Sequence, residues 1–82
     1  MNQRFRRSNA FPRLSAEEQE RQSRAVNAAR LALPGTDAVR DFLNGYHEAL
    51  RARPLDLAIA SEAGLVAVER AIAAEGLRAR NG

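Results

Sequence analysis

The side chains that could do chemistry are few and widely spaced in this sequence. There is one histidine, His47, which Glu48 follows, and there is no cysteine. Catalysis needs a nucleophile beside a base, a pair of carboxylates in one cleft, or metal ligands at a workable spacing. Nothing near His47 completes such a set, so we interpret His47 and Glu48 as a solvated pair. The sequence therefore favours a binding protein over an enzyme and implies no cofactor.

Arginines near the N-terminus could supply a second kind of chemistry, contact with phosphates. Residues 1–13 carry a charge of +4 with no acidic residue, through Arg4, Arg6, Arg7 and Arg13. The rest of the chain sums to −1, so the net charge of +3 belongs to this arm. Its composition shows no helical or alternating period, which predicts a disordered segment when the chain is alone. We keep two interpretations open: a solvated arm, or an auxiliary contact to DNA or to a protein partner.

The length and composition allow one domain with a modest core. The chain has 82 residues, of which 45% are apolar and only 5% aromatic. A chain of this size buries only about 60 to 65% of the surface that its unfolded form exposes. The absence of cysteine, and of any apolar run typical of a secretion signal or membrane span, leads us to expect a cytoplasmic protein with no membrane contact.

The first expected helix occupies residues 14–34. Ser15 followed by Glu18 is a capping box, in which each residue bonds the backbone amide of the other. Pro34 and Gly35 end the helix, because proline cannot continue the hydrogen-bond ladder. Pairs at a spacing of four should stabilise it, namely Glu17 with Arg21 and Glu20 with Arg24.

Three further helices are expected in the remainder of the chain. Thr36 is placed to cap a second helix, whose apolar face is formed by Val39, Phe42, Leu43, Tyr46 and Leu50. This helix either continues through Asn44-Gly45 or ends there. Pro54 fits the first position of a short helix, Ser61 caps the last one, and Gly76 is expected to terminate it. The fold class is thus all-α, a small bundle of about four helices with a disordered basic N-terminal arm.

The second half of the chain carries a specific order of short motifs. They are Asp41-Phe42-Leu43-Asn44, Ala49-Leu50, Arg53-Pro54-Leu55-Asp56-Leu57, Ser61-Glu62-Ala63-Gly64, Val68-Glu69, Ile72 and Gly76. In this order they closely resemble the toxin-binding domain of the MbcA/ParS/Xre antitoxins, the partners of RES-domain toxins. The resemblance covers residues 35–82.

What this resemblance implies is a protein that neutralises an NAD-consuming RES-domain toxin by occupying its active-site cleft. The blocking residues would be those after Gly76, namely Leu77, Arg78, Arg80, Asn81 and Gly82. Arginines on a flexible end could pair with the acidic or phosphate-binding groups of a dinucleotide pocket. The docking scaffold would consist of Phe42, Leu43, Pro54, Leu55, Asp56, Leu57, Gly64, Val68, Ile72 and Gly76.

The main partner expected from this interpretation is a RES-domain toxin. We also expect the chain to form a homodimer or a higher hetero-oligomer with the toxin. Larger members of the family carry an N-terminal DNA-binding helix-turn-helix, whose place is taken here by one helix and a basic arm. Operator DNA is therefore a weaker candidate partner. The rival hypothesis is a small helical nucleic-acid accessory protein that binds DNA through its arginine arm. A third is a helical interaction module without a toxin.

Overall fold

Helices make up most of the computed structural model, which describes residues 14–81. The four helices are α1 (Ala16–Ala32), α2 (Thr36–Asn44), α3 (Pro54–Ala60) and α4 (Glu62–Asn81). The only β structure in this range is an isolated bridge between His47 and Ala52. The prediction of an all-α bundle of about four helices is confirmed. The predicted basic arm, with Arg4, Arg6, Arg7 and Arg13, and the last residue, Gly82, lie outside the described residues.

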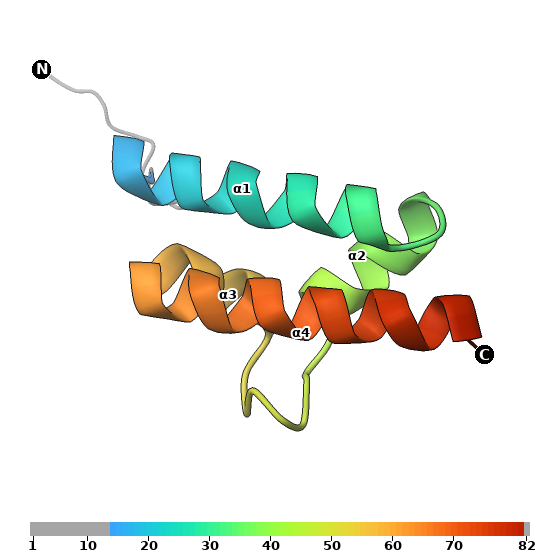
Figure 1. The fold of residues 1–82 in the computed structure, drawn as a ribbon. Coiled ribbons are helices and arrows are strands. Elements are labelled where there is room, and N and C mark those ends of the chain that lie inside the picture. The colour runs from blue at the N-terminus through green and yellow to red at the C-terminus, as the bar shows by residue number, and fades with distance from the viewer. Residues whose placement is uncertain (1–13, 82) are drawn as a thin grey trace, which may run out of the picture.

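The two long helices, α1 and α4, lie side by side and run in the same direction (Figure 1). Their C-terminal ends therefore come together at one end of the bundle, near α2. Helix α1 contacts each of the other three helices, whereas α3 packs chiefly on α4 and α1. Within residues 14–81, no helix combines the length and the apolar character that a membrane crossing requires.

The core is built from small and medium-sized side chains. Its buried apolar members are Ala25, Ala29, Leu33, Val39, Leu43, Ala58, Leu65, Val68 and Ile72. Three of them are alanines with no exposed surface, and the largest fully buried side chains include no aromatic ring. The helices must therefore pack closely, because small side chains fill the space between helix axes only at short separations.

The capping residues agree with the sequence at two helices and differ at a third. In α1, the Ser15 hydroxyl accepts a hydrogen bond from the Glu18 amide at 3.1 Å, and the Glu18 carboxylate accepts one from the Ser15 amide at 2.8 Å. In α4, the Ser61 hydroxyl accepts one from the Gly64 amide at 2.9 Å. The prediction that Thr36 caps α2 is wrong. Gly35 is the cap, with a φ of 98° that a residue with a side chain rarely adopts, and no side chain bonds to the helix end.

The predicted end of the last helix at Gly76 is also wrong. Helix α4 continues to Asn81, and Gly76 is buried against Ala32 of α1. A Cβ added at Gly76 would lie 3.1 Å from the Ala32 carbonyl oxygen and 3.2 Å from its Cβ. Glycine at this position lets two helices approach, and the residues that follow it, mainly leucine, arginine and alanine, favour helix. The expected flexible end is thus helical as far as Asn81.

Helix α2 ends at Asn44, with Gly45 as its C-terminal cap, so the shorter of the two predicted versions is correct. Tyr46 does not belong to the buried face of α2, since 67% of its surface is exposed. The chain leaves the helix at Gly45, and this change of direction leaves Tyr46 facing solvent.

A glycine inside α4 makes the closest approach between helices. A Cβ at Gly64 would overlap the Leu57 carbonyl oxygen of α3. Because the obstacle is backbone, it cannot rotate away as a side chain would. Gly64 therefore fixes the distance between α3 and α4.

We predict that Gly64→Ala lowers the free energy of unfolding by about 2 kcal/mol or more, as expected for overpacking a tight contact. Gly76→Ala is the matched control, because it adds the same methyl group to the same helix. There, a gain in helix propensity of about 1 kcal/mol opposes a milder crowding against Ala32, so the net change should stay within about 1 kcal/mol. Denaturant unfolding followed by circular dichroism measures both. Equal stability of the two variants would show that the α3–α4 contact is not rigid.

Candidate interaction surface

The residues expected to form the docking scaffold are mostly interior. The buried ones are Leu43, Pro54, Gly64, Val68, Ile72 and Gly76, and the half-buried ones are Phe42, Leu55 and Leu57. Only Asp56 is exposed. The structure therefore brings these residues together as the framework of the bundle, and the surface on which a partner could bind must come from other side chains.

Asp56 stabilises the start of α3 rather than offering a free charge. Arg53 donates two hydrogen bonds to its carboxylate, from Nε to Oδ2 at 3.0 Å and from Nη2 to Oδ1 at 2.6 Å. This hydrogen bonding lowers the pKa of Asp56 and raises the pKa of Arg53. The pair is exposed to solvent, so its effect is mainly to hold the turn before Pro54 in place.

The sequence suggested that His47 forms a solvated pair with Glu48, and the structure shows that it does not. The chain after α2 folds back, and the His47 amide donates a hydrogen bond to the Ala52 carbonyl at 3.0 Å. This turn lays the imidazole edge-on against Phe42, with 5.4 Å between ring centroids, and half buries it. Its Nδ1 atom is buried without a hydrogen-bond partner among the described residues. No group of three His, Asp or Glu side chains within residues 14–81 could hold a metal ion.

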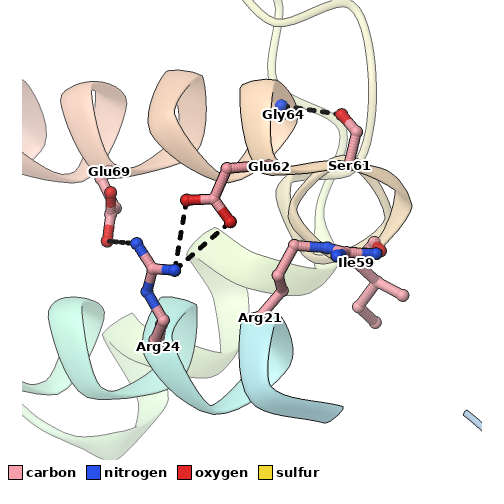
Figure 2. A network of polar contacts seen from close by, with 7 residues as sticks. All are labelled: Arg21, Arg24, Ile59, Ser61, Glu62, Gly64 and Glu69. Atoms are coloured by element: carbon pink, nitrogen blue, oxygen red, sulfur yellow. Dashed lines mark hydrogen bonds and ion pairs between the residues drawn. The ribbon is translucent and has the colours of Figure 1, made fainter. Parts of the chain in front are cut away.

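Two arginines of α1 cross to the other helices, as Figure 2 shows. Arg21 donates two hydrogen bonds to the Ile59 carbonyl, from Nε at 3.0 Å and from Nη2 at 2.6 Å. Helix α3 ends at Ala60, so this carbonyl is one of the last four, which have no partner inside their own helix. Arg24 pairs with two carboxylates of α4, Glu62 at 3.2 Å and Glu69 at 3.9 Å.

These contacts correct the expected pairs of Glu17 with Arg21 and Glu20 with Arg24. The partners of both arginines lie about 40 residues further along the chain, where the bundle offers an unpaired carbonyl and two carboxylates. A pairing within one exposed helix is worth only a few tenths of a kcal/mol, so it does not compete. The arginines therefore fix α1 alongside α3 and the first half of α4.

The residues expected to block a toxin lie on the last turns of α4. Leu77 is 58% exposed, and Arg78 and Arg80 are exposed as well. Arg78 lies 3.7 Å from Glu75. Asn81 is the last residue of α4, and Gly82 lies outside the described range. Because residues three apart share a helix face, Leu77 and Arg80 point to the same side, whereas Arg78 points to another.

A shallow hollow adjoins Leu77 where the ends of α1 and α4 meet. It has a volume of about 390 Å³ and is lined by Leu31, Ala32, Ala73, Gly76, Leu77 and Arg80. Leu31 is 88% exposed, and it is not among the site residues predicted from the sequence. Its exposure could have been predicted, because Leu31 falls outside the apolar face of its helix. Its position beside Leu77 could not, because that depends on the contact between Ala32 and Gly76.

Comparisons with protein-family models, with curated proteins and with solved structures gave no match. The likeness to the antitoxin family thus depends on the order of the motif residues alone.

We predict that Arg21→Met lowers the free energy of unfolding by about 1.5 kcal/mol or more, because it leaves the Ile59 carbonyl without its charged donor. Arg24→Met, the matched control, removes exposed ion pairs and should cost less than about 1 kcal/mol. The cost at Arg24 should shrink further in 1 M salt, which screens exposed charges. Chemical denaturation at low and high salt tests both variants, and a larger loss at Arg24 would contradict the assigned roles.

Proposed function

We propose that the chain is an antitoxin that binds and neutralises a RES-domain, NAD-consuming toxin, and that the C-terminal end of α4 blocks the active-site cleft. The observation that carries the proposal is the exposed helical end of α4, where Leu77, Arg78 and Arg80 all face solvent beyond the buried Gly76. Side chains that add nothing to the core are available to a partner.

The order of motif residues between Asp41 and Gly76 supports the same proposal. In the bundle these positions set helix starts and close helix contacts, as at Pro54 and Gly64. A scaffold of this kind holds the end of α4 in a fixed direction relative to α1. A rigid inhibitor loses less conformational entropy on binding than a flexible segment does.

The helical end changes how the blocking residues would act. On a flexible tail, Arg78 and Arg80 could enter a cleft together. On a helix they point to different sides, and Arg78 already lies near Glu75. Leu77 and Arg80 therefore form the pair that enters the cleft, with the guanidinium of Arg80 placed for a carboxylate of the toxin.

We predict that deleting residues 77–82 abolishes neutralisation, while deleting residues 1–13 leaves it intact. The first deletion should spare the fold, because residues 77–80 are exposed. The assay co-expresses each variant with the RES-domain protein of an adjacent reading frame, expected to span about 150 to 200 residues as one domain does. It records cell survival and NAD content, with a circular dichroism melt to check that each variant is folded.

The opposite pattern would overturn the proposed mechanism. If loss of residues 77–82 is harmless and loss of residues 1–13 ends the protection, the arginine arm carries the activity, as in the rival hypothesis of a nucleic-acid accessory protein. Binding of the full chain to duplex DNA, abolished by the same N-terminal deletion, would then support that rival directly.

A further inference from the structure

One face of α4 carries only apolar and basic side chains from Val66 to Arg80. Its members are Val66, Arg70, Ala73, Leu77 and Arg80, which we call the α4 stripe. They are spaced by four, three, four and three residues, the period of a single helix face. All five are exposed, and the stripe is about 21 Å long at 1.5 Å per residue. Leu31 of α1 extends it sideways beside Leu77.

The charges on this face are uncompensated within the described part of the chain. The stripe contains no carboxylate, and neither Arg70 nor Arg80 pairs with one among residues 14–81. Nearby carboxylates of α4 form ion pairs with other arginines: Glu69 with Arg24, and Glu75 with Arg78. The stripe therefore combines exposed leucine and valine with unpaired positive charge.

Charge decides which occupant fits this face. A second copy that presented the same stripe would bring two more arginines and no carboxylate to the interface, so the positive charges would stay unpaired. The arm of residues 1–13 carries +4 and no acid, so it is repelled as well. Nucleic acid would satisfy the two arginines but would leave Leu31 and Leu77 against phosphates and sugars. A protein surface with an apolar groove edged by carboxylates satisfies both kinds of side chain.

We propose that the α4 stripe with Leu31 is the docking face for the toxin, which meets it with an apolar groove edged by carboxylates. This inference rests on the proposed function and extends it, because it assigns affinity to a surface that begins about three turns before the blocking end. Leu31, Val66 and Arg70 then bind toxin without entering its active site.

The test changes docking residues that lie outside the blocking segment. Leu31→Ser and Arg70→Glu are made singly and together in the full chain, and Tyr46→Ser and Arg51→Glu serve as matched controls. Tyr46 is 67% exposed and Arg51 is exposed, and both lie in the loop between α2 and α3. The probe is the purified RES-domain protein of the adjacent reading frame, and calorimetry measures its Kd at low and high salt.

We expect Leu31→Ser and Arg70→Glu each to weaken binding about tenfold or more, as central interface residues do. The controls should stay within about twofold, the usual scale for substitutions outside an interface. Arg70→Glu should also reduce the salt dependence of the Kd, because it removes a charge that faces carboxylates. At saturating concentration the Leu31→Ser chain should still inhibit NAD consumption, since its blocking end is intact.

Other results would contradict either the proposed function or the docking face. If the unaltered chain does not bind the RES-domain protein, the proposed function fails and the docking face fails with it. If the chain binds and the stripe variants bind as tightly as the controls, only the docking face is wrong. The docking face is also wrong if light scattering finds a dimer that Leu31→Ser dissociates without weakening toxin binding. Loss of DNA binding alone in Arg70→Glu would assign the face to nucleic acid instead.

Discussion

At the junction of α3 and α4, the backbone of Gly64 lies so close to the Leu57 carbonyl oxygen that no side chain fits between them. The rest of the bundle depends on this approach. A core made largely of alanine, valine and leucine excludes water only if its helices are near one another. Ser61 supports the contact, because it caps α4 at the Gly64 amide and so fixes where the helix begins relative to α3.

The close packing of α3 on α4 leaves α1 as the helix that completes the core. Ala25 and Ala29 are fully buried, and the α1 backbone reaches α4 at Ala32, opposite Gly76. Polar contacts follow the same geometry, since Arg21 and Arg24 cross to α3 and α4 rather than pairing along their own helix. In the described part of the chain, α1 is therefore an integral part of the fold, although it lies outside the segment that resembles an antitoxin domain.

What the sequence could predict depends on how far apart the interacting residues are. Three helix starts could be predicted from local spacing alone, because the residues that mark them, Ser15, Pro54 and Ser61, act within one helical turn. Gly76 was misjudged because glycine is common both at helix ends and at close helix contacts, and only the position of Ala32 distinguishes the two. The same holds for the surface: the family resemblance led to Leu77 as a candidate, whereas Leu31 lies 46 residues earlier and only the packing of α1 on α4 places the two leucines on one hollow.

A helix that is needed for folding on one face and exposed on the other has two separable roles. Leu65, Val68 and Ile72 of α4 are buried, and their loss would unfold the bundle. Leu77 is 58% exposed and Arg80 is exposed as well, so substitutions there should cost little stability. The buried face fixes the direction of the helix. A partner that binds the stripe would therefore contact the C-terminal end of α4 in a defined orientation. If α4 acts as proposed, the rigidity of this one helix couples docking to blocking, which a flexible tail would not provide.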